Sequence, residues 1–316
     1  MNNSTDITLP ELNNSTFYCF MAGYIFCGFV QIVGIALMVY AKIEAVNQKL
    51  AIMGLAAAEF LSCMDQILFH IGFLNDFDSL NWWVAFGTFL QTFTALVTKC
   101  MMFVIIIDRF LYIYLSLKYH VCTQTKVLCG ITSIWTLCAI VSGGLGLAGK
   151  YIKDENTIHT IYNTFYCVYF TLDVIITITA ITVYAYFYWK VHLVKLRERT
   201  IVRALKQMHS PPQRTTRFLV PCLIVLNFII FNMSATLILM ITRNTMPLGE
   251  KSIKLSQIAF LLLLLGWLSD AGIFIFFQKE VRNVWKLMMT KRRRFTTRVS
   301  PIGLVSAEAL KETTLS

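Results

Sequence analysis

Long apolar runs separated by short polar segments dominate the chain. Seven of these runs reach the roughly 20 residues that a helix needs to cross about 30 Å of hydrocarbon. The runs are continuous rather than alternating in polarity, which predicts helices and not the strands of a barrel. The seven predicted spans are Phe17–Ala41, Leu50–Leu74, Trp82–Ile107, Val127–Gly149, Ile158–Trp189, Phe218–Thr242 and Leu255–Phe277.

The composition agrees with a protein that lies in a bilayer. Of the 316 residues, 57% are hydrophobic and 14% are charged, whereas soluble proteins contain about 45–50% apolar and about 25% charged residues. The nine cysteines match no zinc-site spacing, and most lie in apolar runs, where cysteine packs as a small hydrophobic residue. The sequence therefore predicts an all-α membrane protein, a seven-transmembrane helix bundle without a large soluble domain.

The positive charges predict how the bundle is oriented. Twenty-two of the 28 Lys and Arg residues lie on the side of the spans that holds the C-terminus, and five lie on the side that holds the N-terminus. Cytoplasmic loops carry an excess of Lys and Arg, so the N-terminus is expected outside the cell. The excess positive charge then reflects topology and attraction to the inner leaflet, and not nucleic-acid binding.

The N-terminal tail is expected to be glycosylated, because four sequons occur on the side predicted to face outward. They begin at Asn2, Asn3, Asn13 and Asn14. The expected organisation is an extracellular tail (1–16), a seven-helix membrane domain (17–290) and a cytoplasmic tail (291–316).

Five charged residues lie inside the predicted spans, where each is costly by about 2.5–3.5 kcal/mol and usually functional. Lys99 and Asp173 have opposite charges at similar depth and are expected to pair, and Asp65 lies in the second span. Glu59 and Asp270 have like charges and are expected to share a proton or to hold a small cation. The alternative is that these residues only hold the helices in register within a hydrated interior.

Several short motifs resemble those of one receptor family. The third span ends in Asp108-Arg109-Phe110, which resembles Asp-Arg-Tyr, and Leu55–Glu59 resembles the second-span Leu-Ala-x-Ala-Asp. Trp135 and Asp270–Phe274 stand where that family carries its fourth-span Trp and its Asn-Pro-x-x-Tyr. The chain thus resembles the rhodopsin-like (class A) G-protein-coupled receptors over nearly the whole membrane domain. Loose similarity to melanocortin and odorant receptors is limited to Leu117-Lys118-Tyr119-His120.

The chain also departs from the family pattern. Gln31 replaces the first-span Asn, and Val84 stands where a Cys usually forms the loop disulfide. Asn232 and Ser234 replace the Trp and Pro of the sixth span. Pro221 lies two turns earlier and is expected to move the kink, since a proline removes a helical hydrogen bond.

The resemblance implies a two-state receptor. A ligand from outside would favour a conformation in which Arg109 leaves Asp108 and, with Phe110 beside it, meets a heterotrimeric G protein. Glu59, Asp270 and Phe274 would form the activation switch, with Na⁺ or a proton near the two carboxyl groups and no other cofactor. A short amphipathic helix over Gln278–Met289 would lie on the inner leaflet. Phosphorylation of the tail by a receptor kinase would recruit arrestin.

The ligand pocket is expected in the outer half of the bundle. Its predicted polar residues include a stripe at helical spacing on the third span. The predicted pocket residues are Gln66, His70, Thr88, Gln91, Thr92, Ala95, Asn232 and Phe260. Amine receptors carry Asp where Gln91 stands, which disfavours a classical monoamine. A small molecule, a lipid, an odorant and a short peptide all stay open.

Two other kinds of protein fit parts of the pattern. A receptor-fold decoy or dimer partner that does not signal is consistent with the altered sixth span. A transporter is consistent with intramembrane charges, but no inverted repeat or pair of broken helices is visible in the sequence. An enzyme is not expected, because neither His-Glu-x-x-His nor Gly-x-Ser-x-Gly occurs. The expected location is the plasma membrane.

Overall fold

The computed structural model describes residues 14–41, 46–74, 81–115, 124–151, 155–202, 216–245 and 250–298. This part of the chain is helical and contains no strand, and seven of its helical segments are long and apolar enough to cross a membrane. The helices, with α6, η3 and α7 forming one span, are α1 (Asn14–Tyr40), α2 (Val46–Leu74), α3 (Asn81–Leu115), α4 (Gln124–Tyr151), α5 (Glu155–Val202), α6 (Thr216–Asn227), η3 (Phe228–Met233), α7 (Ser234–Thr245), α8 (Glu250–Phe277) and α9 (Lys279–Arg298). The expected seven helices of membrane-spanning length and polarity are therefore confirmed.

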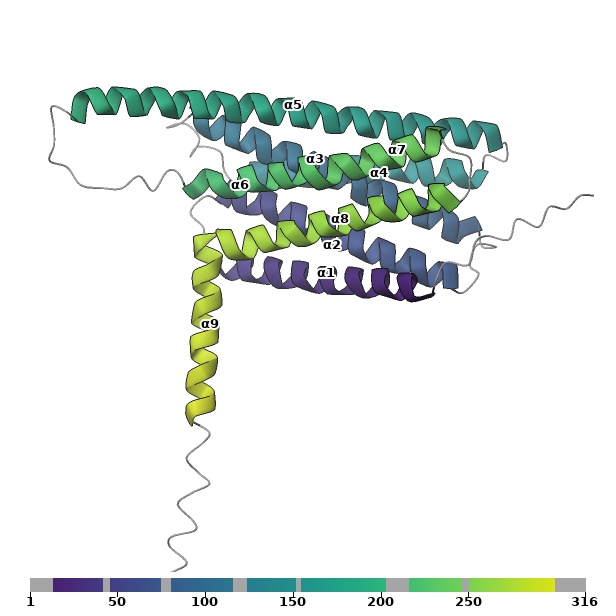
Figure 1. Ribbon diagram of the computed structural model, residues 1–316, viewed down its shortest axis with the longest axis horizontal. Coiled ribbons are helices and arrows are strands. Elements are labelled where there is room, and N and C mark those ends of the chain that lie inside the picture. The colour runs from purple at the N-terminus through teal and green to yellow at the C-terminus, as the bar shows by residue number, and fades with distance from the viewer. Residues whose placement is uncertain are drawn as a thin grey trace, which may run out of the picture.

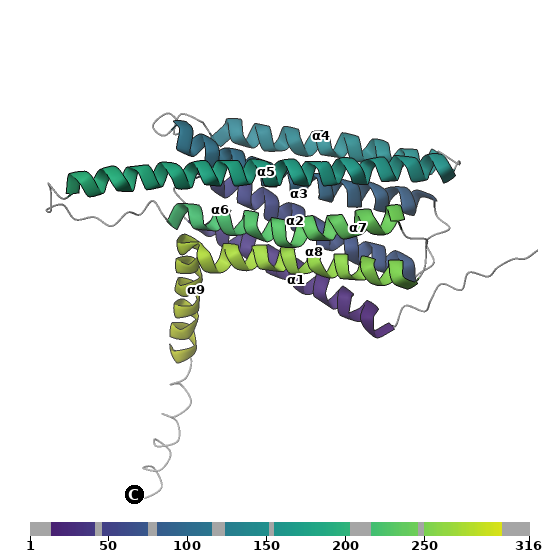
Figure 2. The same ribbon diagram turned by 45° about the horizontal axis from the view of Figure 1, so that its top comes forward.

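The seven spans form one bundle of roughly antiparallel helices (Figures 1 and 2). The third helix, α3, is central, because it packs against α2, α4, α5 and α6, while α1 packs against α2 and α8. Half of the spanning residues of α2 and α3 are buried, compared with 17% in α4. The exposed face of α4 carries Leu137, Ile140 and Leu147. Such side chains suit contact with lipid, because hydrocarbon does not penalise an exposed apolar residue.

Small residues allow close approach where α3 and α4 meet. A Cβ atom added at Gly146 would lie 2.8 Å from the backbone oxygen of Ala85 and 3.1 Å from Cβ of Phe89. No ordinary side chain fits at these distances, so glycine is required for this contact. The same helices are joined deeper in the bundle by Cys100 and Cys138, whose sulfur atoms are 3.9 Å apart.

The sixth span is irregular, but its irregular part does not lie at the proline. Pro221 lies within the regular helix α6, and a π-helical segment, η3, follows at Phe228–Met233. This segment includes Asn232, where the resembled family carries its Trp. The π-helical segment begins after Pro221 and does not include it, and the kink expected at Pro221 stays a prediction. π-Helical turns are rare, and they occur frequently at functional sites.

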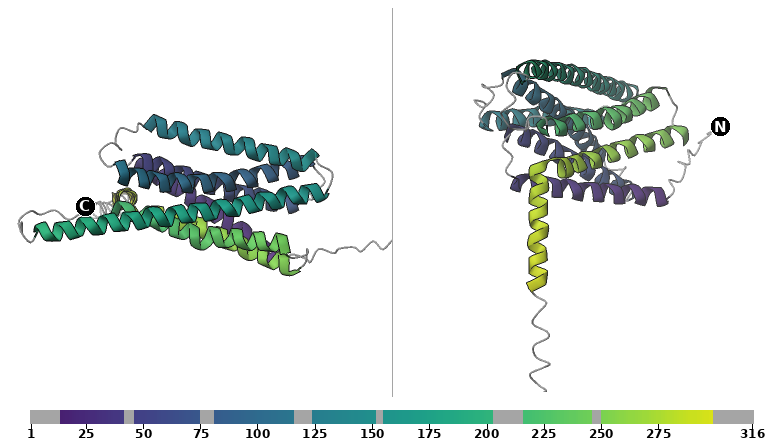
Figure 3. Two further views of the ribbon diagram at one scale, coloured as in Figure 1. Left: turned by 90° about the horizontal axis from the view of Figure 1, so that it is seen from above. Right: turned by 60° about the vertical axis from the view of Figure 1, so that its left-hand side comes forward.

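Two predicted boundaries also change. The fifth span is predicted to end at Trp189, but α5 continues as helix to Val202 and extends past its neighbours (Figures 1 and 3). Its charged residues permit helix because Lys, Arg and Glu are good helix formers. The last helix begins at Lys279 and continues to Arg298, so the first residues of the predicted tail 291–316 are helical.

The final helix, α9, turns sharply away from the bundle (Figure 1). Val281 at its start is buried and belongs to the main apolar core, whereas Trp285, Leu287 and Met288 are exposed. The start of α9 is thus fixed by packing against the bundle. The end of the bundle beside α9 also contains Arg109 and is called the Arg109 end below; the opposite end, where α1 begins, is called the N-terminal end.

Candidate functional site

A cavity of about 310 Å³ lies in the half of the bundle toward the N-terminal end. Five of the seven spans contribute to its wall, from α2, α3, α5, the η3–α7 segment and α8. The lining residues are Ser62, Asp65, Gln66, Thr88, Gln91, Thr92, Thr94, Ala95, Thr98, Phe165, Tyr166, Tyr169, Asn232, Thr236, Leu239, Phe260, Leu263 and Trp267. A cavity of this size, with polar groups converging on aromatic rings, is typical of a small-molecule site.

Most of the predicted pocket residues line this cavity. The stripe of Thr88, Gln91, Thr92 and Ala95 lies on the wall. Gln66, Asn232 and Phe260 do so from three other elements. The side chain of His70 lies outside the described residues. Leu264, one turn beyond Phe260, packs with Tyr24 and Trp267 in a small apolar cluster.

Asp65 is the only acidic residue among the described residues that line the cavity, and none of them is basic. Only 4% of Asp65 is exposed. One carboxylate oxygen accepts a long hydrogen bond of 3.4 Å from the amide of its neighbour, Gln66. Within the described part of the chain Asp65 forms no ion pair. A buried carboxylate without a cationic partner is energetically unfavourable unless it becomes neutral or gains a partner.

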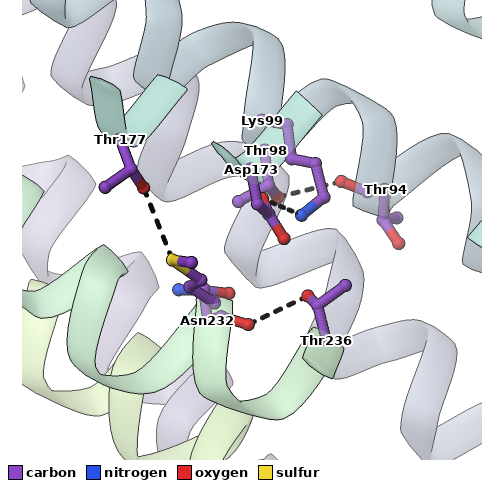
Figure 4. A network of polar contacts seen from close by, with 8 residues as sticks. Thr94, Thr98, Lys99, Asp173, Thr177, Asn232 and Thr236 are labelled. Carbon is purple, nitrogen blue, oxygen red and sulfur yellow. Dashed lines mark hydrogen bonds and ion pairs between the residues drawn. The ribbon is translucent and has the colours of Figure 1, made fainter. Parts of the chain in front are cut away.

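Lys99 and Asp173 form the buried ion pair that their sequence positions predict. Lys99 donates to Asp173 across the α3–α5 contact, and both side chains are almost completely buried (Figure 4). The ammonium lies 3.6 Å from the ring centroid of Tyr169 and 5.7 Å from that of Phe228. Both charges are thus neutralised within the protein, and the aromatic rings add cation–π attraction.

The threonines near this pair are satisfied locally. The hydroxyls of Thr98 and Thr236 donate to the backbone oxygens of Thr94 and Asn232 (Figure 4). Such bonds to the preceding turn are common for threonine in membrane helices. Thr177 instead donates to the sulfur of Met233 at 3.6 Å and so connects α5 to the end of η3.

A second polar cluster, the polar node, consists of Gln31, Glu59, Asn227 and Asp270. Four different helices supply these residues, and all four side chains are buried. Gln31 Nε2 donates to Glu59 Oε2 at 2.6 Å. The side chain of Glu59 interacts with that of Asp270, which also interacts with Asn227. Glu59 and Asp270 therefore lie together, as the sequence predicts.

The polar node has more acceptors than donors. One oxygen of each of its four side chains accepts no hydrogen bond from the described part of the protein, and each of these oxygens is buried. Carboxylate and amide oxygens are suitable ligands for a hard cation. A shared proton would also relieve the repulsion between the two carboxyl groups. The residues present therefore fit the expected Na⁺ or proton, although no group of three or more His, Cys, Asp or Glu that could hold a metal ion occurs in the described residues.

Trp267 connects the cavity to the polar node. Its side chain lines the cavity, and its backbone oxygen accepts a hydrogen bond of 2.9 Å from Gln31 Nε2. The same amide nitrogen of Gln31 donates to Glu59. Asn227 donates to the backbone oxygen of Gly266, the preceding residue in α8, at 2.8 Å. A displacement of α8 at the cavity would therefore alter both hydrogen bonds.

Asp108 and Arg109 form an ion pair near the end of α3. Arg109 Nε donates to Asp108 Oδ2 at 2.9 Å, and the guanidinium makes a second contact with the same oxygen. Arg109 is only 1% exposed, whereas Phe110 is 37% exposed. The large buried cation is therefore held by its own neighbour in sequence.

Phe274 was predicted to form the activation switch together with Glu59 and Asp270. It is fully buried in the apolar core.

Several residues of these sites were not predicted, and three of them make contacts that define the sites. Asn227, Tyr169 and Trp267 lie in apolar spans and carry no charge, so a search for intramembrane charges does not select them. A search that included uncharged amides would find Asn227.

The sequons at Asn2, Asn3 and Asn13 lie outside the described residues, as does the side chain of Asn14, the first residue of α1.

No protein-family model matches the chain, and the comparison with curated proteins finds no match.

Proposed function

We propose that the chain is a divergent rhodopsin-like G-protein-coupled receptor of the plasma membrane. It binds an extracellular ligand and activates a heterotrimeric G protein. The observation that carries this proposal is the order of sites along one seven-helix bundle. The cavity lies toward the N-terminal end, and the Asp108–Arg109 pair lies at the Arg109 end. The polar node lies between them.

The proposed orientation places the N-terminus outside. The strong bias of Lys and Arg toward the Arg109 end supports it. Digestion with an N-glycosidase is expected to reduce the apparent mass of the protein, and this shift is expected to disappear when Asn2, Asn3, Asn13 and Asn14 are all replaced by Gln. An unchanged mass before and after digestion would contradict the outward N-terminus.

In the proposed mechanism, ligand binding moves α8 relative to α1 and α6 at the cavity. Gln31 and Asn227 transmit this movement, because each bonds a backbone oxygen of α8 and contacts a carboxyl-bearing member of the polar node. Na⁺ or a shared proton would neutralise Glu59 and Asp270 in one of the two states. At the Arg109 end, separation of Arg109 from Asp108 would expose the guanidinium to the G protein.

The test is ligand-free G-protein activation in cells, with surface levels matched between variants. Arg109→Ala is expected to reduce the basal signal to background, whereas Asp108→Asn is expected to raise it because it releases the guanidinium. Lys126→Ala is the matched control, since it removes an exposed positive charge at the same end. Equal signals from wild type and Arg109→Ala for every α subunit would contradict coupling and favour a decoy or dimer partner.

A further inference from the structure

The charge of the cavity wall indicates the class of ligand. Ten of the eighteen lining residues are Ser, Thr, Asn, Gln or Asp, and the single charged side chain among them is that of Asp65. We propose that the cavity binds a small ligand that carries a protonated amine, with the Asp65 carboxylate as its counter-ion. This inference rests on the proposed function, since it takes the cavity as the ligand site of the receptor.

The buried cation Lys99 does not neutralise Asp65. Lys99 follows the lining residue Thr98, but its ammonium is bound to Asp173 and lies over the ring of Tyr169. The Lys99–Asp173 pair is neutral as a unit, so the negative charge of an ionised Asp65 would not be compensated by this pair. A ligand cation would compensate for this charge, and charge-assisted hydrogen bonds are the stronger kind.

Aromatic rings complete a site for a cation. Phe165, Tyr166 and Tyr169 line the cavity from α5, and Phe260 and Trp267 line it from α8. Aromatic faces attract ammonium groups and also stack against an aromatic ligand. The position on the third span where amine receptors carry Asp is Gln91, so in this chain the carboxylate is supplied by α2 instead.

The size and polarity of the cavity argue against the other ligand classes. A volume of about 310 Å³ is at the low end for small-molecule sites and leaves no room for a folded peptide. The Asp65 carboxylate and the side-chain amides of the wall are poorly matched to a lipid chain, because their polar atoms would lose hydrogen bonds to water without replacement. A compact aromatic or alicyclic amine fits both properties.

The test is thermal unfolding of the purified full-length protein in detergent with matched probes. Phenyl-, naphthyl- and indolyl-ethylamines are compared with the alcohol and the carboxylate that carry the same ring, at up to about 10 mM, the range in which fragments of this size bind. Ligands that bind the folded state raise the Tm in proportion to their affinity. The variants are Asp65→Asn, Asp65→Glu and, as a control on the exposed face of the same helix, Met64→Ala.

At least one amine is expected to raise the Tm more than its alcohol and carboxylate. Asp65→Asn is expected to weaken the binding of that amine by roughly tenfold or more, while Asp65→Glu and Met64→Ala retain the preference. The proposal is overturned if no amine stabilises the protein, if the alcohol stabilises it equally, or if Asp65→Asn keeps the preference. Should Asp65→Asn fail to fold, the preference for the amine over its alcohol and carboxylate is compared between the wild type and Asp65→Glu. Loss of this preference in the wild type would still overturn the proposal.

These results are independent of signalling. Amine-selective binding together with an Arg109→Ala variant that signals like wild type would leave the ligand class intact and remove the receptor function. A basal signal that depends on Arg109 without any amine binding would leave the receptor function intact and remove the proposed ligand class.

Discussion

Two pairs of charged residues lie inside the bundle, and they are neutralised in different ways. Lys99 and Asp173 have opposite charges and satisfy each other, with Tyr169 against the ammonium. Glu59 and Asp270 have like charges and are surrounded by amides whose oxygens are also acceptors. The first pair is complete in one conformation, which suits a fixed structural contact. The polar node needs a proton or cation, which suits a site whose state can change.

The largest expected effect comes from breaking the complete pair. Lys99→Met leaves Asp173 buried without its cation, and is expected to lower the free energy of unfolding by about 3–5 kcal/mol. The double variant Lys99→Met with Asp173→Leu is expected to recover most of this loss, because an apolar pair of similar volume is often as stable as a buried ion pair. Thermal unfolding in detergent gives the comparison.

The decisive control is a double-mutant cycle, which compares Lys99→Met, Asp173→Leu and the double variant with the wild type. If the effects of the single substitutions add, the two side chains do not depend on each other, and the distinction between a complete pair and an incomplete node fails.

A smaller loss is expected from Gln31→Leu in the polar node. This change removes two hydrogen bonds, to Glu59 and to the backbone oxygen of Trp267. The expected cost is about 1–3 kcal/mol, since one of the bonds is to an acidic group. Gln91→Leu is a matched control on the exposed side of the cavity, with an expected change within about 0.5 kcal/mol. Equal losses in the two variants would argue against a special role for the node.

The smallest effect concerns the ion itself. When choline is replaced by Na⁺ at ten times the Kd of Na⁺ for the polar node, the wild type is expected to be stabilised by about 1.4 kcal/mol. Glu59→Gln is expected to abolish this gain, whereas the double variant of Lys99 and Asp173 is expected to keep it. Stabilisation by acid without any response to Na⁺ would instead identify a shared proton, and a response in neither case would contradict a titrating or ion-binding node.

Hydropathy and charge predict much of this arrangement. The seven spans follow from apolar length alone, and the partners of Lys99 and Glu59 follow from the scarcity of charges in those spans. Most of the cavity stripe follows from helical spacing on α3. These features share one physical cause, which is that charged and apolar groups differ strongly in their cost of transfer into a bilayer.

Other features depend on energies that the sequence pattern does not display. Trp267 and Asn227 are ordinary residues for a membrane helix, and only packing places Trp267 between the cavity and the node and Asn227 within the node. The π-helical turn at Phe228–Met233 depends on a change in backbone hydrogen-bond register, whereas the visible signal, Pro221, lies in regular helix. The polar continuation of α5 to Val202 has no apolar run to indicate it.

The most direct test of the central claim is ligand-free G-protein activation by wild type, Arg109→Ala and Glu59→Gln at equal surface levels. A basal signal is expected in the wild type, and Arg109→Ala is expected to reduce it to background. Glu59→Gln is expected to change this signal by about fivefold or more, since a switch couples distant sites by about 1–3 kcal/mol. The same signal in all three proteins would contradict a receptor that is controlled by the polar node.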